Sequence, residues 1–134
     1  MERSAQYVLV VDDDASIRLL CRINLELAGW SVREAATIAE ARERLADHAI
    51  DVVLLDVMVG TDSGVAFLEE LRRDYPETPV AMLTGWVDAP TTEGDAVDAV
   101  LTKPFTLEGL VETVQTLAEG RKTGNPAPAA RTSR

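Results

Sequence analysis

The sequence predicts an α/β fold, an open parallel sheet with helices on both faces. Short apolar runs alternate along the chain with longer segments whose apolar residues recur at helical spacing. Three of the runs are continuously apolar and rich in Val and Leu, as expected of strands that are buried on both faces. The length of 134 residues suits one compact domain.

Five apolar runs are the predicted strands, and the second of them is weak. They are Tyr7–Val11, Val32–Ala35, Val52–Leu55, Val80–Leu83 and Ala99–Leu101. The first predicted helix begins near Ala15, with Asp13 or Asp14 as its cap. Gly29 is its natural stop. The inward face of this helix is predicted to hold Ile17, Leu20, Cys21 and Leu25.

Three further segments have helical features. A capping box from Thr37 to Glu40 begins the second helix, which turns Ala41 and Leu45 inward. The third helix covers about residues 64–73 and buries Phe67, Leu68 and Leu71. The last helix begins after Thr106 and aligns the apolar residues Leu107, Leu110, Val111, Val114 and Leu117.

The charge of the chain is unevenly distributed. Net charge is −10, but residues 1–119 carry nine basic and 23 acidic side chains, which leaves −14 on that part. So acidic a body repels phosphate backbones, which argues against direct nucleic-acid binding and favours cations and basic partner surfaces. From residue 120 the sequence is rich in Gly, Pro, Ala and Arg without periodicity. We therefore predict a domain over residues 1–119 and a flexible tail or linker over residues 120–134.

The compartment is predicted from two features. Cys21 is the only cysteine, which excludes an intramolecular disulfide framework and fits a reducing environment. The first apolar run, Tyr7–Val11, is too short for a signal peptide or a membrane span. We expect a soluble, cytoplasmic protein without a membrane interaction.

Polar residues gather where the predicted strands end. Asp12 and Asp13 follow the first strand, and Asp56 follows the apolar part of the third. Thr84 and Lys103 follow the fourth and fifth strands. The carboxyl ends of parallel strands share one edge, so these side chains should converge there. Clustered carboxylates repel one another unless a cation lies between them, and Mg²⁺ prefers carboxylate oxygens. A lysine and a hydroxyl opposite the metal would hold a phosphoryl group, with one carboxylate as its nucleophile.

Four motifs make the chain resemble response-regulator receiver domains over about residues 6–118. They are Val10-Val11-Asp12-Asp13, Leu54-Leu55-Asp56-Val57-Met58, Leu83-Thr84-Gly85 and Leu101-Thr102-Lys103-Pro104-Phe105. The resemblance implies a flavodoxin-like sheet of five parallel strands in the order 2-1-3-4-5. It also implies a phosphoryl donor, a sensor histidine kinase or a histidine phosphotransfer protein, and a downstream protein target that the sequence leaves unknown.

The resemblance also implies a role for each site residue. Asp56 accepts the phosphoryl group, while Asp13, Asp56 and the backbone carbonyl of Met58 bind Mg²⁺ directly. Asp12 acts on the metal through water. Thr84 hydrogen-bonds the phosphoryl group and moves toward it. Lys103 pairs with that group, and its bond to Pro104 is expected to be cis.

The chain departs from the family at its expected output face. Val100 stands where relatives often have an aromatic ring that turns inward when Thr84 moves. Only nineteen positions separate Thr84 from Lys103, about one helical turn fewer than in the family, and residues 86–99 include Pro90 and Gly94. We therefore predict that the fourth helix is short or missing, which leaves open both the family's usual dimer contact and the oligomeric state.

Two large apolar residues, Met58 and Trp86, occupy positions that tune self-dephosphorylation in the family. They are expected to hinder the attacking water, so the protein is predicted to be no enzyme beyond slow self-dephosphorylation. The main alternative function is a constitutive interaction module that keeps the fold without switching. A haloacid-dehalogenase phosphatase would need an aspartate at Met58. An FMN-binding domain would need a hydroxyl- and glycine-rich loop after the first strand.

Overall fold

A computed structural model describes residues 6–85 and 97–123 of the chain. Its main sheet is parallel and has five strands, as predicted. They are β1 (Tyr7–Val11), β2 (Ser31–Ala35), β3 (Val52–Asp56), β6 (Val80–Thr84) and β7 (Ala99–Thr102). Their order is β2-β1-β3-β6-β7, which is the predicted 2-1-3-4-5 because β4 and β5 lie outside this sheet.

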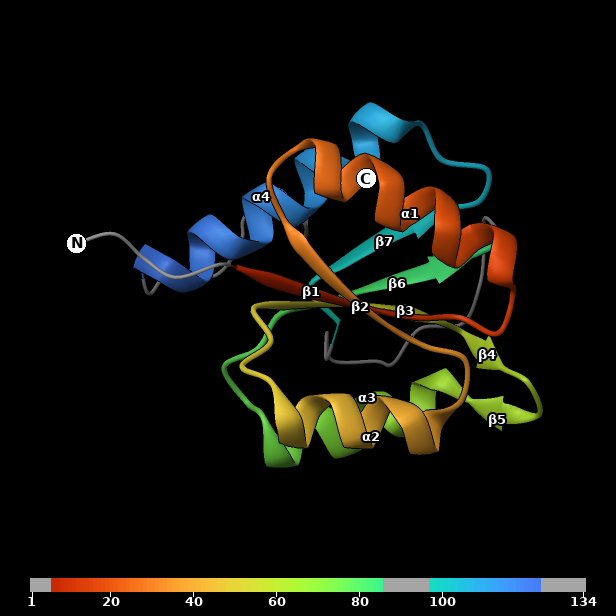
Figure 1. The fold of residues 1–134 in the computed structure, drawn as a ribbon. Helices are drawn as coiled ribbons and strands as arrows, with labels where there is room; N and C mark the ends of the chain where they lie inside the picture. The colour runs from red at the N-terminus through yellow and green to blue at the C-terminus, as the bar shows by residue number, and fades with distance from the viewer. Residues whose placement is uncertain (1–5, 86–96, 124–134) are drawn as a thin grey trace.

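Two pairs of helices enclose the sheet, one pair on each face (Figure 1). One layer holds α1 (Ala15–Leu27) and α4 (Leu107–Thr123), and the other holds α2 (Ile38–Asp47) and α3 (Gly64–Asp74).

The caps of the first two helices agree with the sequence signals. Asp14 caps α1 by accepting the backbone N–H groups of Ser16 and Ile17, and Gly29 after the helix has φ +100°. Thr37 caps α2 by accepting the Glu40 N–H at 3.0 Å.

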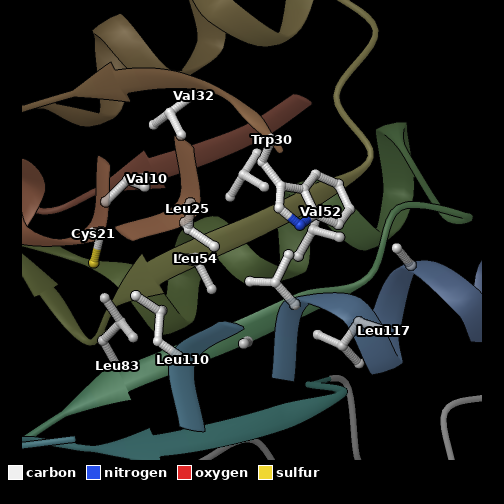
Figure 2. Packing of buried hydrophobic residues seen from close by; sticks show 14 of the residues in the cluster. Val10, Cys21, Leu25, Trp30, Val32, Val52, Leu54, Leu83, Leu110 and Leu117 are labelled. Carbon is white, nitrogen blue, oxygen red and sulfur yellow. The ribbon is translucent and has the colours of Figure 1, made fainter. Parts of the chain in front are cut away.

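Side chains along each central strand alternate between two separate cores. In β1, Val8 and Val10 face the layer of α1 and α4 and belong to the same core as Cys21 and Leu25. Figure 2 shows Val10 in this core with Cys21 and Leu25. Leu9, Val11 and Phe67 belong to the second core, beneath α2 and α3. Most of these side chains are fully buried. The continuous apolar runs therefore fill both faces of the sheet, as predicted for strands between two helical layers.

The prediction that Leu20 faces inward is wrong, because this side chain is 40% exposed. Cys21 and Leu25 fill the side of α1 that meets the sheet, and Leu20 lies about 100° around the helix from Cys21. Other large apolar side chains share the exposed face of α1, namely Leu19, Ile23 and Leu27. Helical spacing in the sequence therefore indicated the helix but not which of its apolar residues are covered.

A small hairpin follows the third strand of the main sheet and was not predicted. It pairs β4 (Met58–Val59) with β5 (Asp62–Ser63) in antiparallel register, and Gly60 between them has φ +64°. The left-handed backbone conformation at this position of the turn favours glycine. The hairpin leads directly into α3, so it connects the end of β3 with the start of that helix.

The sequence predictions that concern residues 86–96 and 124–134 fall wholly or partly outside the described residues. A short or missing fourth helix over residues 86–99 cannot be compared with the structure, because residues 86–96 are not described. Helix α4 continues to Thr123 and residues 124–134 are not described, so the division at residue 119 stays a prediction. Among the described residues, no helix combines the length and the apolar character needed to cross a bilayer.

Candidate functional site

Three carboxylates meet at the carboxyl ends of two neighbouring strands. Asp12 and Asp13 follow β1, while Asp56 is the last residue of β3. The parallel pairing of Val11 with Leu55 places the two strand ends side by side. Each of the three aspartates offers an oxygen within 4.8 Å of the others. The structure thus brings together the acidic residues that the sequence predicted.

Asp12 is the buried member of this cluster, with its side chain 1% exposed. Its Oδ1 accepts the backbone N–H of Asp14 at 2.9 Å, and its Oδ2 accepts from Lys103 Nζ at 3.0 Å. A buried carboxylate is costly unless it is paired and hydrogen-bonded, and both conditions are met here. Asp13, by contrast, is exposed and faces solvent at the rim of the site.

Lys103 is the cation opposite the acids. It follows β7, where its backbone N–H donates to the Thr84 carbonyl, and its bond to Pro104 is cis as predicted. Its Nζ also lies 3.6 Å from Asp56 Oδ2, so it contacts two of the three carboxylates. Burial alone would lower the pKa of Lys103, but hydrogen bonds and charge from Asp12 and Asp56 outweigh it and raise the pKa.

Asp56 combines partial burial with a like charge nearby. Burial first, and then the Asp12 carboxylate, raise the pKa of Asp56 from 3.8 to about 6. Lys103 and the backbone N–H of Met58 act in the opposite direction. A divalent cation between the carboxylates would remove the repulsion that raises this pKa. The donor set therefore fits Mg²⁺, which prefers carboxylate oxygens and retained waters.

Gly64, the first residue of α3, lies directly against the backbone of Asp56. A Cβ at this position would lie 2.0 Å from the Asp56 carbonyl oxygen and 2.9 Å from that of Val57. The Gly64 N–H donates to the Val57 carbonyl at 2.6 Å. Only glycine permits this approach, so α3 supports the strand end that carries Asp56.

The other predicted residues occupy the same edge of the sheet. Thr84 ends β6 and is 3% exposed, in parallel pairing with Thr102 of β7. Met58 begins β4 with its side chain in solvent, 47% exposed. The roles of Thr84 toward a phosphoryl group and of the Met58 carbonyl toward a metal stay predictions.

Arg18 is a contributor to the site that the sequence reasoning missed. Its Nη1 donates to the Asp12 carbonyl oxygen at 2.9 Å, and its Nε donates to Glu34 Oε1 at 3.0 Å. The acceptor on Asp12 is a backbone atom, which leaves no signature in the sequence. The only available signal was the position of an arginine one turn into the helix that follows the acidic residues.

Comparisons with known proteins agree with this geometry. The sequence model of the response regulator receiver domain family matches residues 8–115. The chain is 37% identical over 117 residues to the response regulator protein PilR of Pseudomonas aeruginosa, a match that covers 84% of the chain and 26% of PilR. The first curated relatives are thus much longer than the chain, which spans about half of their length or less.

Solved structures resemble the fold closely. The chemotaxis response regulator CheY4 of Vibrio cholerae superposes with a TM-score of 0.75 at 35% identity, over 84% of this chain and 98% of that one. A CheY-like receiver domain protein from Methanospirillum hungatei reaches a TM-score of 0.80 over 91% of this chain and all of its own. Its identity is 23%, so this second likeness concerns the fold alone.

Proposed function

The chain belongs to the response-regulator receiver domain family, and from that premise we propose that it is a phosphorylation switch with Asp56 as the phosphoryl acceptor. The observation that carries the proposal is the convergence of Asp12, Asp13 and Asp56, with Lys103 Nζ 3.0 and 3.6 Å from two of them. Asp56 is the acceptor because it ends a central strand while keeping 15% of its side chain exposed. Asp12 is buried and already holds two hydrogen bonds.

The chemistry requires an ionised carboxylate and a means to offset phosphoryl charge. With a pKa of about 6, Asp56 is mostly ionised at neutral pH. One of its oxygens attacks phosphorus while the bond to the donor's leaving group breaks, which gives an acyl phosphate. Lys103 Nζ offsets the charge of the phosphoryl oxygens, and the Thr84 hydroxyl donates a hydrogen bond to them. Mg²⁺ held by Asp13, Asp56 and the Met58 carbonyl would neutralise further charge, with Asp12 bound through water.

The phosphoryl donor in this proposal is a sensor histidine kinase or a histidine phosphotransfer protein, and the product signals to a protein target. The acidic body, with −14 on residues 1–119, supports a protein partner over direct contact with nucleic acid. A cytoplasmic location is part of the same proposal, since the sole cysteine, Cys21, is a buried free thiol.

A long-lived phosphorylated state follows if Met58 and Trp86 impede water at the acceptor. Met58 lies two residues after Asp56, and this large apolar residue is 47% exposed. Trp86 lies outside the described residues. Replacing Trp86 by Glu should speed the loss of phosphate, measured by intact mass over time after the donor is removed. An unchanged decay rate would contradict the idea.

The acceptor is tested by intact mass after incubation with Mg²⁺ and a small-molecule phosphodonor. We expect the wild-type protein to gain one phosphoryl group only when Mg²⁺ is present, and Asp56→Asn to gain none. Asp47→Asn is the matched control, because Asp47 is the exposed last residue of α2 and takes no part in the site. It should gain the group as the wild type does.

A constitutive interaction module is the second candidate, and Val100 is the observation that favours it. Val100 is 40% exposed on β7 and has no ring that could turn inward. The same experiment separates the two candidates. A folded wild-type protein that binds Mg²⁺ but gains no phosphoryl group would favour the constitutive module and overturn the switch.

A further inference from the structure

The peptide that joins Asp12 to Asp13 is held by a side chain from α1. Its carbonyl oxygen accepts a hydrogen bond from Arg18 Nη1 at 2.9 Å. This oxygen belongs to the peptide plane between two residues of the acidic cluster, so its direction fixes how one carboxylate is turned relative to the other. A charged donor makes the bond stronger than one between neutral groups.

Arg18 is itself oriented by β2. Its Nε pairs with Glu34 Oε1 at 3.0 Å, and the two side chains are only 18% and 27% exposed. The next residue of β2, Ala35, accepts the Asp12 N–H at 3.1 Å. The backbone of Asp12 is therefore held from both sides, directly by β2 and through the planar fork of Arg18. A lysine could not reproduce that two-pronged geometry.

We propose that Arg18 is a positioning residue for the cation site, and that it turns the Asp12–Asp13 peptide so that the carboxylates converge on one divalent ion. Asp13 depends on this most, because it is exposed and, among the described residues, no hydrogen bond from its own side chain holds it in place. Groups that orient metal ligands commonly affect metal affinity by about 10–100-fold when they are removed. The inference rests on the proposed Mg²⁺-dependent function.

A positioning role and a purely electrostatic role predict opposite effects. If Arg18 acted only as a nearby positive charge, its removal would reduce repulsion of Mg²⁺ and tighten binding. If it orients the peptide, its removal lets the carboxylates diverge and weakens binding. The sign of the change in Mg²⁺ affinity therefore distinguishes the two roles.

The experiment is calorimetric titration of the full chain with Mg²⁺ alone, at fixed pH and ionic strength. Arg18→Met keeps much of the aliphatic stem and should raise the Kd for Mg²⁺ by about tenfold. Arg22→Met is the matched control. Arg22 lies on the same helix and pairs with the same Glu34 at 3.1 Å, but its side chain is 50% exposed and, within the described part of the chain, it makes no hydrogen bond or ion pair with Asp12. The Kd of Arg22→Met for Mg²⁺ should stay within about twofold of the wild-type value.

A second variant keeps the test valid if Arg18→Met does not fold, as judged by circular dichroism. Arg18→Lys retains the charge but not the fork, and should raise the Kd by roughly threefold or more. An unchanged or lower Kd in whichever variant folds would overturn the positioning role, and so would an equal loss in Arg22→Met. A wild-type protein that binds no Mg²⁺ would instead overturn the proposed function, and this inference with it.

Discussion

Replacing Asp56 by Asn should stabilise the protein when no divalent cation is present. In the folded chain the pKa of Asp56 is raised from 3.8 to about 6 by burial and by Asp12. The folded state therefore binds a proton more tightly than the unfolded state does. The contribution of Asp56 to stability is therefore greatest below its unfolded pKa and is lost as the pH rises from about 4 through about 6.

The size of the effect follows from this shift. Each pKa unit corresponds to about 1.4 kcal/mol, so two units set an upper bound of about 3 kcal/mol at pH 7. Because 15% of the Asp56 side chain remains exposed, solvent screening reduces this figure, and we expect a gain of about 1–2 kcal/mol. Asn keeps the shape of the side chain without its charge. Lys103 loses a partner at 3.6 Å but retains Asp12 at 3.0 Å.

The assay is urea denaturation of wild type, Asp56→Asn and the control Asp47→Asn, in chelator, at pH 4 and pH 7. The difference between Asp56→Asn and wild type should be large at pH 7 and should nearly vanish at pH 4. Adding Mg²⁺ should then stabilise the wild type, by about 2.7 kcal/mol at 100 times the Kd, and should stabilise Asp56→Asn much less. An Asp56→Asn protein that is no more stable at pH 7, or whose gain does not depend on pH, would refute the reasoning.

Three other predictions concern the surroundings of the acceptor. Lys103→Met should lower the free energy of unfolding by about 3 kcal/mol in urea denaturation, because the buried Asp12 loses its cationic partner; a cost below about 1 kcal/mol would contradict this. Gly64→Ala should cost about 3 kcal/mol in thermal unfolding, since its Cβ would lie 2.0 Å from the Asp56 carbonyl oxygen; wild-type stability would disprove the close approach. Burial and the charge of Asp12 raise the pKa of the Cys21 thiol to about 12, so Cys21 should react with a thiol reagent only after unfolding. Rapid labelling of the folded chain would contradict its burial.

The sheet and the acid cluster were predictable because they depend on sequence signals that extend over several consecutive residues. Continuous Val- and Leu-rich runs identify strands buried on both faces, and parallel strands must end at one edge. Asp12 and Asp56 follow two such runs, so their proximity required only the strand order. The helix caps were equally local: Thr37 is confirmed, and of the two candidates Asp13 and Asp14 it is Asp14 that caps α1.

What the sequence missed depends on contacts that leave no periodic pattern. The hairpin of β4 and β5 has two residues in each strand, too few for an alternation to be recognised. Helical spacing wrongly predicts Leu20 on the inward face of α1, because this helix carries more apolar residues than its buried face accommodates. The bond from Arg18 to the Asp12 carbonyl involves a main-chain acceptor that every residue type possesses.

The alternation of β1 between two cores also restricts how this strand can change in length. Val8 and Val10 face one core while Leu9 and Val11 face the other. A single-residue insertion within the strand would turn the residues that follow it, Asp12 included, to the opposite face of the sheet. An insertion of two residues would restore the facing. The effect of an insertion in β1 should therefore depend on whether the number of inserted residues is odd or even. Odd insertions should lose the acid cluster, and even insertions should keep the orientation of Asp12.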